Sequence, residues 1–192
     1  MELCYTLAGI RYEAPNMSDS ELLGLSAHGD EAAFTALYRR HKDAVFRFAL
    51  HMSGQPHIAE EITQEVFLLL IHRPKQYQPE RGTLEAFLIG VARNKLRKQR
   101  REQQLPESDV NSAALLHARS HSEAFELELL QSAILTLPAR YREVIVLCEL
   151  EEKTYEETAR LLGCAVGTIR SRLHRAKGIL GTKVRHKEGC SA

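Results

Sequence analysis

The chain has 192 residues, of which 44% are hydrophobic and 27% charged, so it has room for one or two small globular domains. No apolar run approaches the length that spans a bilayer, and the N-terminus lacks the basic and apolar segments of a signal peptide, so we expect a cytoplasmic protein without membrane insertion. The 26 Lys and Arg residues nearly balance the 25 Asp and Glu residues, which excludes a global basic field.

Helix signals dominate the first half of the chain. Ser18 and Glu21 have the spacing of a capping box, in which both side chains satisfy backbone N–H groups at a helix start. Asp30 is expected to cap a second, longer helix, which Gly54 would end. Pro56 suits the first turn of a third helix. The pattern predicts three consecutive helices without an intervening strand.

The third helix is expected to separate apolar from polar residues. Ile58, Ile62, Val66 and Leu69 would face inward, and Glu60, Glu61, Gln64 and Glu65 would lie on the opposite side. Residues 73–83 are rich in Pro, Gly and polar groups and are typical of a loop. Thr83 then caps a fourth helix, whose C-terminal half is strongly basic.

Basic residues gather in two separate runs. Residues 93–101 form the first run and residues 170–187 the second, while the stretch between them is acidic. Residues 102–121 lose helical periodicity and are predicted to be a linker. We therefore expect an all-α protein with an N-terminal extension (1–17), a helical domain (18–101), a flexible linker (102–121), a second helical domain (122–187) and a short tail (188–192). Two basic patches on separate units fit two contacts with a polyanion.

The second domain contains a predicted helix-turn-helix. After a helix from about Ser122, a turn at Leu137-Pro138 and another helix, Thr154 and Glu157 repeat the capping-box spacing. Gly163 suits the left-handed residue that stops this helix. Apolar residues from Ile169 onward then recur at helical spacing in a second amphipathic helix.

The free face of that last helix suits the major groove of DNA, where arginine can bind guanine through two hydrogen bonds. It carries Thr168, Arg170, Ser171, Arg172, His174 and Arg175. A plain helical hairpin with a solvated face is the alternative. The capping box, turn glycine and arginine-rich face together favour DNA binding.

Nothing in the sequence indicates catalysis. There is no phosphate-binding glycine loop, zinc motif or nucleophile elbow, so we expect no catalytic residues, no metal and no cofactor. The cysteines at positions 4, 148, 164 and 190 have no CxxC spacing and are interpreted as free thiols.

Several long stretches in the same order resemble the extracytoplasmic-function (ECF) sigma factors, the smallest members of the housekeeping sigma family. Residues 59–68, AEEITQEVFL, are similar to the polymerase-clamp helix of region two. Residues 82–101 are similar to the promoter-melting helix, and residues from Leu137 through Leu180 look like region four. Glu61 stands where aspartate is frequent in the family, which keeps the charge and lengthens the side chain.

The resemblance implies partners and site residues. Core RNA polymerase would bind through its clamp and flap, and promoter DNA would be bound at two elements. Contacts with the clamp would come from Glu61, Ile62, Gln64, Glu65 and Phe67. Contacts with the −10 element would come from Tyr77, Arg81, Thr83, Arg93, Asn94, Arg97, Lys98 and Arg101. Contacts with the −35 element would come from the helix-turn-helix face named above.

The resemblance also implies control by a dedicated anti-sigma factor, because a flexible linker would let the two halves close on each other or around an inhibitor. The alternative function is a helix-turn-helix transcription regulator that does not replace the sigma subunit. A second basic helix in the N-terminal half, without an obvious ligand site or dimer seam, favours the sigma factor.

Overall fold

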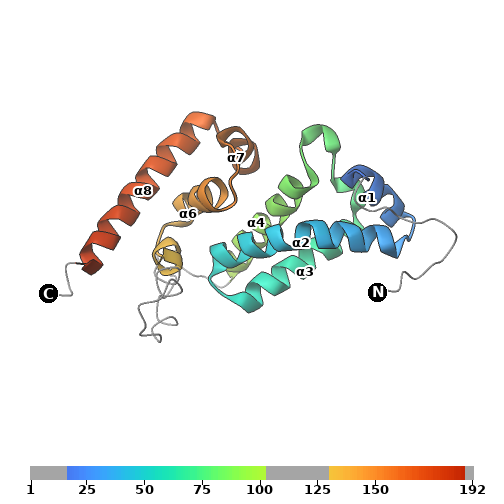
Figure 1. The fold of residues 1–192 in the computed structure, drawn as a ribbon, viewed down its shortest axis with the longest axis horizontal. Helices are drawn as coiled ribbons and strands as arrows, with labels where there is room; N and C mark the ends of the chain where they lie inside the picture. Colours follow the sequence, from blue (N-terminus) through green and yellow to red (C-terminus); the bar gives the residue numbers. More distant parts are fainter. Residues whose placement is uncertain (1–16, 103–129, 189–192) are drawn as a thin grey trace, which may run out of the picture.

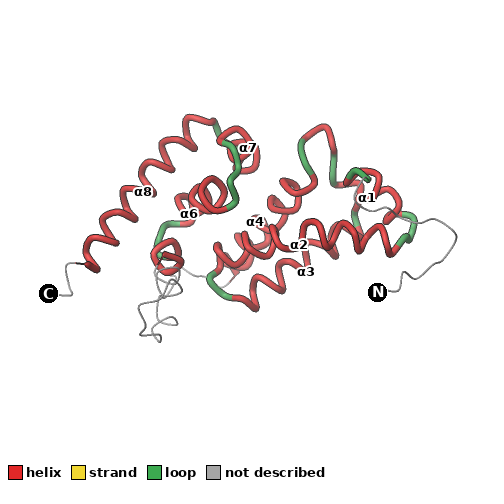
Figure 2. Tube along the Cα trace, in the orientation of Figure 1, coloured by secondary structure: helices red, strands yellow, loops and turns green. Residues whose placement is uncertain are grey.

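The computed structural model describes residues 17–102 and 130–188, with the side chains of the last helix described through Thr182. The extension at 1–16, most of the expected linker and the tail from 189 lie outside the described residues, as do Cys4, Cys190 and the expected helix start near Ser122. All regular structure in the described residues is helical, which confirms the predicted all-α class (Figure 2). None of the described helices is long and apolar enough to cross a membrane.

The N-terminal half is a bundle of four α-helices (Figure 1). These helices are α1 (Asp19–Ala27), α2 (Glu31–Ser53), α3 (Pro56–His72) and α4 (Leu84–Glu102), with two short 3₁₀ turns, η1 (Pro74–Gln76) and η2 (Pro79–Arg81), in the loop before α4. The residues predicted to cap or end these helices do so at the predicted positions. Ser18 and Glu21 form a complete capping box, the Asp30 carboxylate accepts from the N–H of Ala33 at 2.9 Å, and Gly54 ends α2 with a φ of 73°.

The C-terminal half begins with helical residues 130–135 and continues through α6 (Ala139–Ile145), η4 (Val146–Leu150), α7 (Tyr155–Leu162) and α8 (Val166–Glu188). Pro138 marks the start of α6, in agreement with the predicted turn. The segment η4 is a single wide π-helical turn, whereas the sequence predicted an uninterrupted α-helix there.

Buried apolar side chains of both halves form one continuous cluster. In the N-terminal half, α2 supplies Leu37, Val45 and Phe48, and α4 supplies Leu88 and Ile89, all essentially inaccessible to solvent. In the C-terminal half the buried residues include Val144, Leu147, Ile169 and Ala176. The two halves lie side by side, with α7 facing the loop that leads into α4 (Figure 1). The helix α7 contacts both basic helices, α4 and α8, so it lies between the two basic surfaces.

Candidate nucleic-acid and polymerase interfaces

The helix-turn-helix consists of α7, the turn at Gly163 and α8. Thr154 and Glu157 form the predicted capping box at the start of α7, and Gly163 ends it with a φ of 65°. Ile169, Leu173 and Ala176 turn inward and fix the rotation of α8. Because those positions are buried, the residues between them must face outward.

The outward face of α8 carries the residues that the sequence assigned to DNA. Arg170, Ser171, His174 and Arg175 are exposed, whereas Thr168 and Arg172 are half-buried at its edges. Arg170 lies near the ring of Tyr155 on α7, with 6.0 Å between its guanidinium carbon and the ring centroid. Arg175 hydrogen-bonds Tyr141 on α6 and thereby lowers the pKa of that phenol. Tyr155 on α7 thus orients Arg170, and Tyr141 on α6 orients Arg175.

A second basic surface runs along α4. Asn94, Arg97, Lys98 and Arg101 are exposed on it. Arg93 is different, because its guanidinium forms a double hydrogen bond with Glu143 on α6, at 2.8 and 3.1 Å, and only 15% of its side chain is exposed. The structure therefore separates Arg93 from the other predicted −10 residues: it is held by the C-terminal half.

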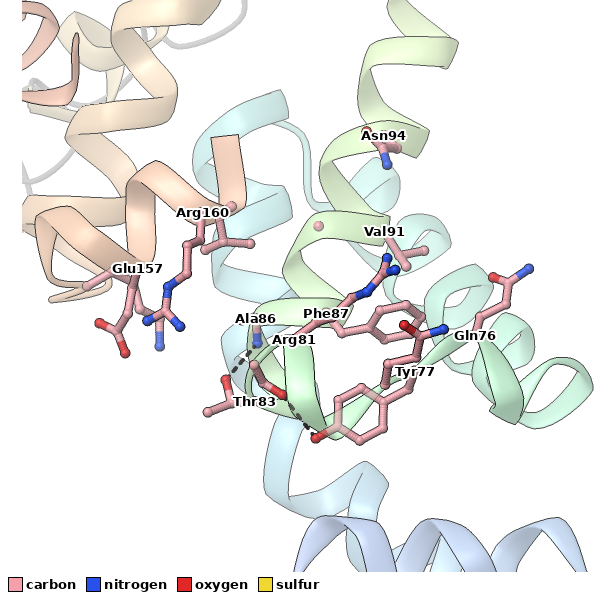
Figure 3. Close-up of a pocket in the computed structure, with 15 residues that line it drawn as sticks. Gln76, Tyr77, Arg81, Thr83, Ala86, Phe87, Val91, Asn94, Glu157 and Arg160 are labelled. Atoms are coloured by element: carbon pink, nitrogen blue, oxygen red, sulfur yellow. Dashed lines mark hydrogen bonds between the residues drawn. The ribbon is translucent and has the colours of Figure 1, made fainter. Parts of the chain in front are cut away.

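The loop before α4 borders a cleft of about 560 Å³ (Figure 3). The Tyr77 hydroxyl donates to the carbonyl of Gly82 at 3.2 Å, and its ring packs against Phe87 with centroids 5.7 Å apart. Burial raises the pKa of Tyr77. Thr83 caps α4 by accepting from the N–H of Ala86 at 3.2 Å. Arg81 is exposed at the cleft, and the opposite wall comes from α7, including Arg160 (Figure 3).

The exposed face of α3 differs in part from the predicted one. Glu61 and Gln64 are exposed, and Glu65 is half-buried with its carboxylate 2.5 Å from the Lys95 ammonium on α4. Ile62 and Phe67 are each only 3% exposed, because Ile62 packs into the bundle and Phe67 packs in edge contact with Tyr38 and Phe34. These two side chains lie in the core, so neither presents a surface to a partner.

Two apolar side chains that were not among the predicted clamp contacts lie on the surface of α3. Leu68 is 44% exposed and Ile71 is 45% exposed, three and six residues after Glu65. Contiguous exposed apolar patches rimmed by polar residues mark interaction sites, and Leu68 and Ile71 are neighbours one helical turn apart. Their apolar character alone could not distinguish them from core residues, because α3 is apolar on more than one side.

In the described part of the chain, no three His, Cys, Asp or Glu side chains lie together in an arrangement that could hold a metal ion. Cys148 and Cys164 are free thiols. Cys148 lies 3.4 Å from the Thr158 hydroxyl, and burial raises the pKa of its thiol.

Comparison with known proteins decides the family. Residues 37–105 match the family described as Sigma-70 region 2, and residues 127–180 match Sigma-70, region 4. The chain is 36% identical to the ECF RNA polymerase sigma factor SigE of Mycolicibacterium smegmatis over 79% of this chain and 62% of that protein. It is 32% identical to the ECF RNA polymerase sigma factor EcfG of Rhodopseudomonas palustris over 69% of this chain and 75% of that protein.

The chain belongs to the ECF RNA polymerase sigma factors. The predicted family is thereby confirmed, and it is supported over the helix-turn-helix regulator that acts without replacing the sigma subunit.

Solved structures agree on the fold of this sigma factor. The sigma factor RpoE from Bartonella quintana, in complex with the anti-sigma factor NepR, aligns with a TM-score of 0.66 and 24% identity over 79% of this chain and 96% of that chain. CnrH, in complex with the cytosolic domain of CnrY, aligns with a TM-score of 0.66 and 25% identity over 88% of this chain and 97% of that chain.

Proposed function

We propose that this sigma factor directs core RNA polymerase to promoters in the cytoplasm and initiates transcription there. The observation that carries the proposal is the pair of basic surfaces on α4 and α8, which lie within the segments that match regions two and four. We expect each half alone to bind DNA weakly, and tethering the two contacts in one protein raises the effective concentration of the second.

The −35 element is assigned to α8, whose exposed basic face fits the major groove. Arg170 and Arg175 would read or anchor the DNA, and Ser171 and His174 would add contacts. Thr168 and Arg172 flank this face and are suited to phosphate contacts.

The −10 element is assigned to the cleft beside the loop before α4 and to the basic face of α4. A single strand that leaves the duplex could insert a base beside Tyr77 and Phe87 while Arg81, Arg97, Lys98 and Arg101 neutralise phosphates. Thr83 and Asn94 offer polar groups to the base, and Arg93 would join them only after it leaves Glu143. Few aromatic rings line the cleft, so base capture in the loop is favoured over a row of stacked bases.

The polymerase clamp is assigned to the exposed face of α3, through Glu61, Gln64 and Glu65, with Leu68 and Ile71 beside them. Ile62 and Phe67 support this face from the core. A second contact, with the polymerase flap, is assigned to the C-terminal half.

Charge reversal on α3 tests the clamp assignment. Glu61→Lys with Glu65→Lys should weaken core binding at least tenfold, or ~1.4 kcal/mol, because a complementary contact becomes a like-charge one. The matched control for charge reversal is Glu31→Lys with Asp43→Lys on α2. A second control, Lys95→Gln, breaks the ion pair with Glu65 but leaves both glutamates in place, so it separates the effect of losing this ion pair from the effect of losing the clamp contact. Equal affinity of the α3 variant and its control in fluorescence anisotropy, with native circular dichroism, would exclude this face.

An anti-sigma factor is assigned as the inhibitory partner, because a relative of the same fold, RpoE from Bartonella quintana, is bound to the anti-sigma factor NepR. Such a partner would cover the surfaces that bind polymerase or promoter. It can be captured from the source organism with the full-length tagged protein and identified by mass spectrometry.

Spacing between the promoter elements should affect transcription steeply. Each added base pair moves one element by ~3.4 Å along the duplex and rotates it, so on polymerase the two DNA surfaces lose simultaneous contact. Transcription by holoenzyme on a promoter series with about one to three added base pairs should fall at each step. Flat output across the series would contradict the assignment of two DNA contacts.

A further inference from the structure

The loop before α4 has a defined shape of its own. The N–H groups of Tyr77, Arg81 and Gly82 donate to carbonyls three residues earlier, at 3.2, 3.0 and 3.2 Å. Gly82 has a φ of 144°, a backbone conformation that residues with a side chain rarely adopt. A Cβ atom at Gly82 would meet no atom beyond its chain neighbours within 4 Å. The conformation of the loop, and not a lack of space, therefore requires glycine here.

A side-chain hydrogen bond joins the two ends of this loop. The Tyr77 hydroxyl donates to the Gly82 carbonyl at 3.2 Å, between residues five positions apart. That carbonyl belongs to the peptide that leads into Thr83, the cap of α4. Because burial raises the pKa of Tyr77, its hydroxyl keeps its proton and remains a donor near neutral pH. The bond therefore helps to set the direction in which the chain enters α4.

The Tyr77 hydroxyl also has a partner outside the loop. The Ser20 hydroxyl, in the first turn of α1, hydrogen-bonds the same oxygen. The ring of Tyr77 is half-buried and packs against Phe87. A phenol has a single hydrogen to donate, and that hydrogen is committed to Gly82. Tyr77 therefore cannot donate to a DNA base while this bond is intact.

Helix α1 is anchored at the end that reaches the loop. Asp19, the neighbour of Ser20, accepts from the Arg40 guanidinium at 2.6 Å, and its second oxygen lies 2.9 Å from Nε2 of His41. Both partners are on α2, and the His41 side chain is buried. Leu22, three residues after Asp19, is inaccessible to solvent. Ser20 thus meets the loop from a helix that charge-assisted hydrogen bonds and core packing hold in place.

The loop held in this way is the one that we assign to the −10 strand. Arg81 and Thr83, the neighbours of Gly82 on either side, are exposed and line the cleft (Figure 3). Groups that contact a base bind it better when their positions are set before the strand arrives, because ordering them on binding costs conformational entropy. A hydrogen bond that fixes Gly82 therefore affects both of these neighbours at once.

We propose that Tyr77 is a positioning residue for promoter melting: its hydroxyl, held between Gly82 and Ser20, fixes the shape of the loop that captures a base of the −10 strand. The inference rests on the proposed −10 assignment, but the order of the loop can be measured in the free protein without DNA. Tyr77 acts through Gly82, and α1 supports the loop although it lies outside the cleft.

Amide hydrogen exchange of the free full-length protein, followed by NMR, tests the order of the loop. Tyr77→Phe removes only the hydroxyl, and Ser20→Ala removes its partner on α1. Both should make the amides of residues 81–82 exchange about three- to tenfold faster, the effect of losing one hydrogen bond. The matched controls, Tyr38→Phe on α2 and Ser26→Ala at the other end of α1, should leave these rates unchanged.

An unchanged exchange rate at residues 81–82 in both test variants, with native circular dichroism, would overturn the positioning of the loop by Tyr77. Faster exchange in Tyr77→Phe and Ser20→Ala, but not in their controls, would support it. If the two changes act through the same hydrogen-bonded group, the double variant should exchange little faster than either single variant.

Base capture is measured with holoenzyme and the fluorescein-labelled non-template strand of a promoter that the unmodified holoenzyme transcribes from a genomic library. One abasic nucleotide is moved along the −10 element, and the position at which it weakens binding most identifies the captured base. Tyr77→Phe should bind the intact strand about three- to tenfold more weakly than the unmodified protein. It should lose much less affinity relative to the unmodified protein when this base is absent, because both changes act on the same contact.

Three outcomes of the abasic series are informative. A smaller penalty for the missing base in Tyr77→Phe than in Tyr38→Phe would support the role of Tyr77 in capture. Equal weakening by Tyr77→Phe on intact and abasic strands would overturn that role, since a general loss of stability acts on both strands alike. If no position of the −10 strand affects binding by the unmodified holoenzyme, the proposed −10 assignment is wrong, whatever the exchange rates of the loop show.

Discussion

Replacing Arg142 by alanine is expected to lower the free energy of unfolding by roughly 2–5 kcal/mol, the usual range for losing buried hydrogen bonds and opening a cavity. The Arg142 side chain is 1% exposed and donates to the carbonyls of Met52, Leu135 and Leu137. Alanine would leave three buried acceptors without a donor and a cavity between α2 and α6. Burial lowers the pKa of Arg142 to about 10, so the group stays protonated at neutral pH.

The matched control for this variant lies two residues earlier on the same helix. Arg140 is exposed and stacks on the ring of Tyr141, with 4.8 Å between its guanidinium carbon and the ring centroid. Arg140→Ala should change stability by less than about 1 kcal/mol. Urea unfolding followed by circular dichroism measures both, and equal midpoints would show that the buried guanidinium is not needed for packing.

Replacing Arg170 by alanine should reduce transcription from promoters that depend on the −35 element by roughly 5- to 150-fold, the equivalent of ~1–3 kcal/mol for one arginine contact to a base. Arg170 is exposed on α8, and no ion pair with it is found in the described residues, so its removal should not disturb the fold. Arg39→Ala, an exposed arginine on α2, is the control for the loss of one surface charge.

Two measurements separate base recognition from general attraction. In vitro transcription should fall for the Arg170 variant and hold for the Arg39 variant. Footprinting should show weaker protection at the −35 element only. If Arg170→Ala transcribes and protects like the unmodified protein, α8 does not read this element through that residue.

Helix starts and ends could be predicted from the sequence where they depend on hydrogen bonds or backbone conformation within a few residues. Ser18, Asp30 and Thr154 cap helices through hydrogen bonds to backbone groups three positions later, and Gly54 and Gly163 end helices through their own backbone conformation. None of these depends on a distant partner. The wide turn at Val146–Leu150 was not predicted, because its residues have ordinary helical spacing. The turn closes where the Glu151 N–H donates to the carbonyl of Val146 at 2.9 Å, five residues earlier instead of four.

The sequence predicted only part of the exposed face of α3 correctly. Glu61 and Gln64 were expected on the surface because charged and amide groups are costly to bury. Ile62 and Phe67 were assigned to the polymerase surface by resemblance, but they lie at the same helical spacing as core residues. Which apolar side of α3 is covered depends on where α2 and α4 pack, and that left Leu68 and Ile71 exposed.

By itself the sequence determined the all-α class, the capped ends of α1, α2 and α7, the helix-turn-helix and the family, since each depends on local hydrogen bonding, helical periodicity or ordered motifs. Only the tertiary structure decided that Arg93 is paired with Glu143, and that Lys153 and Glu151 reach α4 and α2. A charged residue looks alike in sequence whether it faces solvent, DNA or a distant carboxylate. Its partner is fixed by how the two halves pack, and this packing depends on shape and burial over the whole chain.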